Sequence, residues 1–114
     1  MPKIINVEKI IADSLREKVV ILIFWAKGCP FSIAARDHCL ILRKRGLKVS
    51  VRCVGSINDR EVLSDTASLI NSVLLKNKQQ VVTWPQVLYR RGNSRKFTRM
   101  KGGSEELIKT NFGV

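Results

Sequence analysis

The hydrophobic positions of this chain change their spacing several times, and each change predicts a new element of secondary structure. Over residues 4–17 apolar side chains recur at helical spacing, and Asn6 can cap that helix. The following run, residues 19–25, is continuously apolar and rich in β-branched side chains. Such a run is typical of a strand buried on both faces of a parallel sheet.

A proline and a glycine mark the two ends of the next predicted helix. Pro30 suits the first turn of a helix, and Gly46 after two basic residues is a typical stop signal for that helix. Residues 47–53 then alternate between apolar and polar, which predicts a strand with one wet face near a sheet edge. In this interpretation Cys53 belongs to the buried face of the strand.

The last part of the chain predicts one more long helix and a hairpin. Residues 58–74 follow helical spacing, residues 81–89 and 96–100 read as two strands, and a last short helix begins near residue 104. The expected fold class is therefore α/β, in the order α-β-α-β-α-β-β-α. A length of 114 residues, with 45% hydrophobic and 26% charged residues, predicts a single domain over 1–114 and excludes disorder.

The charge is the unusual feature of the composition. Twenty-one Lys and Arg against nine Asp and Glu give a net charge of +12, which attracts anionic partners. The three cysteines form no disulfide framework and no zinc-knuckle spacing, which indicates a reducing compartment. The longest apolar run, residues 19–26, is too short to span a bilayer, and no secretory signal is visible, so we expect a cytoplasmic protein without membrane contact.

Three short motifs lie at matching points of this order of elements. They are Cys29-Pro30-Phe31-Ser32 after the first strand, Thr83-Trp84-Pro85 before the third, and Gly102-Gly103-Ser104-Glu105 before the last helix. Together they resemble the active site of the glutaredoxin family in its single-cysteine form. The resemblance covers residues 4–110 and implies a thioredoxin-like fold, with a four-stranded mixed sheet flanked by helices. It also implies the activity of a glutathione-dependent disulfide oxidoreductase that acts as a monomer.

Cys29 is the expected nucleophile on chemical grounds as well. Disulfide exchange needs an accessible thiolate, and the free amides at a helix N-terminus favour an anion. Lys27 adds a nearby positive charge, and Ser32, one turn into the helix, is expected to donate a hydrogen bond to the sulfur. The alternative is an inert loop cysteine. Ser32 stands in place of a second active-site cysteine, so no dithiol route is expected.

The resemblance assigns the glutathione contacts to residues from all three motifs. Trp84 is expected to pair its backbone with the glutathione cysteine beside a cis Pro85, with Thr83 as support, although Trp84 equally suits the core. Ser104 and Glu105 are expected to hold the γ-glutamyl end, with Gly103 allowing close approach, while the alternative for them is helix capping. Pro30 supports the loop, and Lys27 and Phe31 complete the expected glutathione-binding set.

Two other functions stay open. Relatives with one active-site cysteine can share a [2Fe–2S] cluster between two subunits, in which Cys29 would be the protein ligand; no other metal ligand is expected. A basic stretch can bind nucleic acid or an acidic protein, and here it consists of Arg90, Arg91, Arg95, Lys96, Arg99 and Lys101. We expect this stretch to project as a hairpin that steers acidic or glutathionylated partners. Its alternative is a solvated face, and Cys39 and His38 are expected to be core residues.

Overall fold

The structure is a computed structural model that describes residues 4–74, 83–92, 94–100 and 107–109. Its elements alternate along the chain and match the predicted order. They are α1 (Val7–Arg16), β1 (Ile21–Lys27), α2 (Pro30–Lys44), β2 (Val49–Ser56), α3 (Arg60–Leu74), β3 (Gln86–Tyr89) and β4 (Thr98–Arg99). Residues 107–109 are also helical. The start of the predicted last helix lies outside the described residues.

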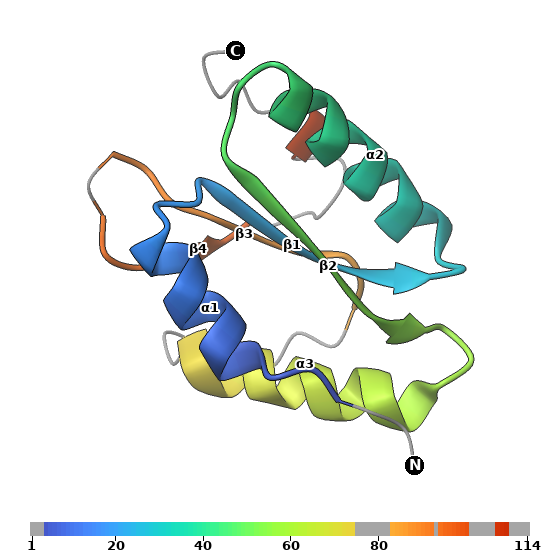
Figure 1. The fold of residues 1–114 in the computed structure, drawn as a ribbon. Helices are drawn as coiled ribbons and strands as arrows, with labels where there is room; N and C mark the ends of the chain where they lie inside the picture. The colour runs from blue at the N-terminus through green and yellow to red at the C-terminus, as the bar shows by residue number, and fades with distance from the viewer. Residues whose placement is uncertain (1–3, 75–82, 93, 101–106, 110–114) are drawn as a thin grey trace.

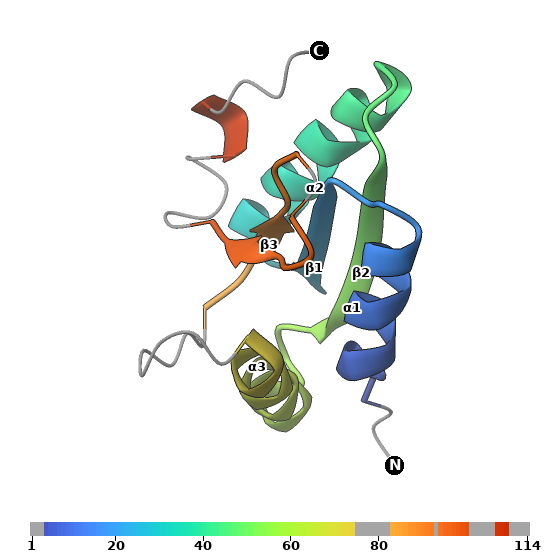
Figure 2. The same ribbon diagram turned by 90° about the vertical axis from the view of Figure 1, so that its left-hand side faces the viewer.

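Four strands form one mixed sheet in the order β2-β1-β3-β4. β1 pairs in parallel with β2 and antiparallel with β3, and β3 pairs antiparallel with β4. Helix α2 covers one face of this sheet, while α1 and α3 cover the other (Figure 1). The chain is therefore an α/β protein with three layers, and the turned view separates the layers clearly (Figure 2).

The side chains of β1 divide between two hydrophobic clusters because successive residues of a strand point to opposite faces. Leu22, Phe24 and Ala26 pack with residues of α1 and α3, whereas Ile21 and Ile23 pack with residues of α2. The first four residues of β1 are all buried. The prediction of a strand buried on both faces is confirmed, and it explains why the run lacks polar residues.

Strand β2 lies at the edge, as its alternating pattern predicts, but Cys53 is exposed rather than buried. Cys53 pairs with Trp25 in the same register as Ile21 with Val49 and Ile23 with Val51, so it lies on the face of the sheet that α2 covers. At its position on the edge strand this face is open to solvent, whereas the next residue, Val54, is buried in the cluster on the other face. The prediction for Cys53 was wrong because alternation in sequence shows which face a residue is on but not how far the opposing helix covers that face.

Candidate active site

Cys29 lies at the point where the buried strand β1 gives way to helix α2. It is the N-cap residue of α2 with an extended backbone (φ −92°, ψ 116°), and Pro30 is the first helical residue. The Cys29 carbonyl accepts a hydrogen bond from the Ile33 amide at 2.9 Å, which starts the helical ladder. The half-buried Cys29 thus lies beside the first amides of a helix, which have no partner within the helix itself.

The segment before β3 lies next to the same thiol, because β3 is the neighbour of β1 in the sheet. The Cys29 Sγ atom is 3.9 Å from the carbonyl oxygen of Trp84, within reach of a weak S–H···O hydrogen bond. The Trp84–Pro85 peptide is cis, as predicted, and Pro85 is buried while Thr83 is exposed. Trp84 is half-buried and packs against the cluster on the α1 and α3 face. Two of the three motifs therefore meet in space although 55 residues separate Cys29 and Trp84.

A third segment, the loop between β2 and α3, closes on the residues just before Cys29. The Ile57 amide donates to the Lys27 carbonyl at 2.9 Å. Gly28 has a φ of +87°, and a Cβ atom at Gly28 would lie 3.2 Å from Ile57 Cγ1. Our sequence reasoning missed both Gly28 and Ile57. The glycine directly before the cysteine was a signal for a special backbone conformation at Gly28. The sequence has no signal for Ile57, because it does not show which loop packs against this glycine.

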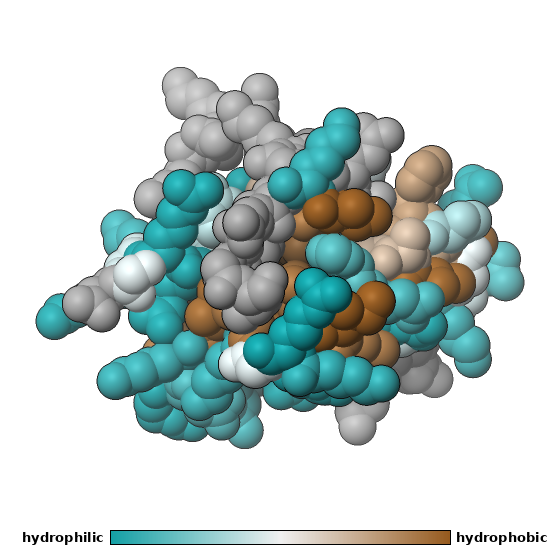
Figure 3. Space-filling view, turned by 90° about the horizontal axis from the view of Figure 1, so that it is seen from above, coloured by the Kyte–Doolittle hydropathy of each residue, from teal (hydrophilic) through white to brown (hydrophobic). Residues whose placement is uncertain are grey.

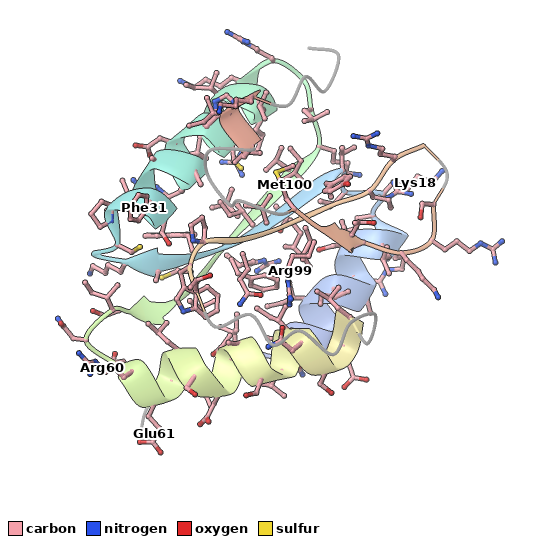
Figure 4. All side chains as sticks on the ribbon, turned by 180° about the vertical axis from the view of Figure 1, so that it is seen from behind. Lys18, Phe31, Arg60, Glu61, Arg99 and Met100 are labelled. Carbon is pink, nitrogen blue, oxygen red and sulfur yellow. The ribbon has the colours of Figure 1, made fainter. Side chains whose placement is uncertain are left out.

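Two exposed apolar side chains flank the thiol. Phe31 is 67% exposed at the start of α2, and Ile57 is 42% exposed. Phe31 projects from the end of the molecule where α2 begins (Figure 4). Lys27 is also exposed there, at the end of β1. This end of the sheet thus offers a thiol, an aromatic ring, an aliphatic side chain and a cation.

Ser32 does not behave as predicted. It is fully buried, and its Oγ atom has no hydrogen-bond partner among the described residues. The expected hydrogen bond from Ser32 to the sulfur of Cys29 is therefore absent. The N-cap cysteine has an extended backbone, so its side chain need not follow the helical path on which the prediction was based.

The other two cysteines differ from Cys29 and from each other. Cys39 is fully buried in α2, and burial raises its pKa to about 12, so it stays protonated at neutral pH. Cys53 is exposed on the edge strand, and its thiol lies 3.8 Å from the carbonyl of Gly55. Two accessible thiols are thus present in the described residues, and they lie in different surroundings.

The predicted basic hairpin is present, but its residues do not form one uniform surface. Arg91, Arg95 and Lys96 are exposed, whereas Arg90 is half-buried and donates to the carbonyls of Val19 and Ser94. The turn between β3 and β4 is therefore fixed to the start of β1.

Arg99 departs from the prediction of a solvent-facing hairpin charge. Its guanidinium donates to Asn71 Oδ1 at 2.5 Å and to Gln86 Oε1 at 3.4 Å, and burial lowers its pKa. It lies between the sheet and α3 (Figure 4). Arg99 therefore joins β4 to α3 and does not belong to the exposed basic surface.

Several predicted residues cannot be placed. Gly103, Ser104, Glu105 and Lys101 lie outside the described residues.

Within the described ranges, no group of three or more His, Cys, Asp or Glu side chains is arranged to hold a metal ion. None of the helices in the described part of the chain combines the length and hydrophobicity that a membrane span requires.

Comparison with known proteins adds no relative to this picture. No family model matches the chain, and neither a curated protein nor a solved structure matches it.

Proposed function

We propose that this protein is a glutathione-dependent monothiol disulfide oxidoreductase with a thioredoxin-like fold, in which Cys29 is the nucleophile. The observation that carries the proposal is the position of the Cys29 thiol. It is accessible, it caps the N-terminus of α2, and it lies 3.9 Å from the backbone carbonyl that precedes Pro85. A helix N-terminus favours a thiolate, and the main chain of a segment beside the thiol can hydrogen-bond an extended peptide such as glutathione.

The reaction uses one thiol and balances without a metal. The Cys29 thiolate attacks the glutathione sulfur of a mixed disulfide, a Cys29–glutathione disulfide forms, and the substrate thiolate leaves and takes a proton from solvent. The thiolate of a second glutathione attacks the glutathione sulfur of this adduct. Oxidised glutathione leaves, and the Cys29 thiolate is regenerated.

The neighbouring residues have separate roles in this proposal. The Trp84 backbone binds the cysteine residue of glutathione, and the Lys27 ammonium attracts its carboxylate. Phe31 covers the apolar part of the ligand next to the sulfur, with 67% of its own surface available for contact. Gly103, Ser104 and Glu105 keep their predicted role at the γ-glutamyl end.

The test is the mass of the protein after mild treatment with oxidised glutathione, combined with turnover of a small glutathione mixed disulfide. Because Cys53 is exposed, the measurement uses the Cys53→Ser variant as its reference. We expect one glutathione adduct on this reference and none when Cys29→Ser is added, with turnover lost in parallel. An adduct or turnover that survives Cys29→Ser in this background contradicts the proposal.

The iron–sulfur alternative differs in its stoichiometry. It needs Cys29 from two copies and two glutathione thiols as ligands, so it predicts a dimer with visible absorbance after anaerobic reconstitution. A monomer that turns over the mixed disulfide and stays colourless after reconstitution excludes it.

A further inference from the structure

Basic side chains gather at the end of the sheet opposite Cys29. The parallel strands β1 and β2 start side by side, with Ile21 paired to Val49, and β3 ends there because Tyr89 pairs with Ile21. The α1–β1, α2–β2 and β3–β4 turns therefore share one end of the sheet. Figure 1 shows them at the left and upper left, whereas α2 begins at the right.

Backbone hydrogen bonds hold these three turns together. The Val20 amide donates to the Lys48 carbonyl at 2.8 Å, and the Arg90 amide donates to the Val20 carbonyl at 2.9 Å. The Arg90 guanidinium adds a bond to the Val19 carbonyl at 3.2 Å. The side chains that project from the three turns thus belong to one fixed surface.

We call this surface the basic pole. All of its cationic residues are exposed to solvent except Arg90, which is half-buried. They are Arg16, Lys18, Arg43, Lys44, Arg45, Lys48, Arg90, Arg91, Arg95 and Lys96. Among the described residues, the acids within or next to these turns are Asp13, which pairs with Arg16, and Glu17. The hairpin recognised in the sequence is therefore one part of a larger surface built from three segments.

The chemistry of the basic pole favours phosphate over a protein partner. Protein interfaces usually have an apolar centre, whereas none of the described residues within these three turns is an exposed large apolar side chain; Ile41 on α2 and Ile108 are the exposed ones nearby. All three turns contribute arginine side chains, and a single guanidinium group can donate two parallel hydrogen bonds to the oxygens of one phosphate. Seen from above, hydrophilic side chains extend from the left end, and hydrophobic patches lie toward the middle and right (Figure 3).

The spacing and the aromatic content favour a duplex over a single strand. Neighbouring strands lie about 4.8 Å apart, so turns on β1, β2 and β3 spread over roughly 10 Å, close to the width of a nucleic-acid groove. Single-strand binding depends on exposed aromatic rings for base stacking. Two aromatic residues are described on the β3–β4 hairpin: Phe97 is buried, and Arg91 already lies over the ring of Tyr89 at 5.5 Å.

We propose that the basic pole binds double-stranded nucleic acid through its backbone phosphates, without reading the sequence. The site is separate from Cys29. Lys18 marks one end of the molecule, and Phe31 and Arg60 mark the other (Figure 4). The proposal therefore stands independently of the proposed disulfide chemistry.

The experiment measures fluorescence anisotropy of labelled DNA duplexes of about two helical turns, with two unrelated sequences, between about 50 and 200 mM salt. We expect both duplexes to bind equally, with an affinity that falls steeply as salt rises. Two triple variants test the basic pole. The first carries Lys44→Gln, Arg45→Gln and Lys48→Gln at the α2–β2 turn. The second carries Arg91→Gln, Arg95→Gln and Lys96→Gln on the hairpin. Each should weaken binding about tenfold or more and lower the salt slope by about 2 to 3.

A matched control removes the same charge elsewhere. Lys9, Arg52 and Arg60 are exposed and lie away from the basic pole, so their joint replacement by Gln should change affinity less than about threefold. Thermal unfolding checks that each variant is folded, and the two pole variants alter different turns, so one can fail to fold without ending the test.

Three results overturn the proposal. The first is a control variant that weakens binding as much as the pole variants, since net charge alone then explains the affinity. The second is pole variants that bind like the wild type. The third is equal or tighter binding to single-stranded DNA, to polyglutamate or to anionic phospholipid vesicles, each compared at equal charge.

Discussion

Replacing Gly28 by alanine tests how the loop before Cys29 is held. Gly28 has a φ of +87°, a conformation that L-residues adopt only at a cost of about 1–2 kcal/mol. The new Cβ would also lie 3.2 Å from Ile57 Cγ1. Ile57 is 42% exposed and can move by a few tenths of an ångström, so the backbone cost dominates. We expect Gly28→Ala to lower the free energy of unfolding by about 1–2 kcal/mol, measured by urea denaturation.

Gly46 provides the matched control. Its φ is +100°, and a Cβ there meets no atom within 4 Å, so Gly46→Ala carries the backbone cost without the contact. The two variants should therefore lose similar stability. They should differ in activity, because Gly28 adjoins the proposed nucleophile whereas Gly46 lies beyond the other end of α2. Small displacements of reacting atoms cost large factors in rate, so we expect mixed-disulfide turnover to fall about tenfold in Gly28→Ala alone.

Two outcomes would refute this reasoning. If Gly28→Ala is as stable as the wild type, the positive φ does not constrain the loop. If Gly46→Ala reduces turnover as much as Gly28→Ala, the loss follows general instability and not the geometry next to Cys29. Turnover is measured well below the unfolding transition of each variant, so that the folded fraction does not enter the comparison.

Two further predictions follow from buried groups. Ser32→Ala removes a buried hydroxyl that has no hydrogen-bond partner in the described part of the chain, and it should raise the free energy of unfolding by about 1 kcal/mol. A clear loss of stability in urea denaturation would show that the hydroxyl is bonded. The Cys39 thiol keeps its proton up to about pH 12 when folded and loses it near 9.0 when unfolded, so its contribution to stability is complete below pH 9 and is lost between pH 9 and 12. Unfolding measured across this range should therefore show a steeper loss in the wild type than in Cys39→Ala, and equal slopes would contradict the burial of this thiol.

The order of elements could be predicted because each depends on local sequence. The continuous apolar run that predicts β1 and the proline that predicts the start of α2 are signals contained within a few residues. Both predictions are confirmed. The cis peptide before Pro85 is confirmed as well, though the resemblance and not the local sequence implied it.

The errors fall on residues whose surroundings come from distant segments. Cys53 is exposed because the face of the edge strand at its position is not covered by another element, and Arg99 lies inward, where it donates to Asn71 on α3. Neither partner is visible from the residue's own neighbours in sequence. Ile57 was missed for the same reason, since its contact with Lys27 joins the loop after β2 to the end of β1.

The topology also decides which charges can influence Cys29. In the sequence, a net charge of +12 surrounds the cysteine without any indication of distance. In the structure, the seven residues of β1 separate the basic pole from Cys29, which at about 3.3 Å per residue is more than 20 Å. That distance exceeds the Debye length of about 8 Å at physiological salt, so the basic pole contributes little to the potential at the thiol. The positive potential next to Cys29 therefore comes from the N-terminus of α2 and from Lys27, while the excess charge at the other end remains available for phosphates.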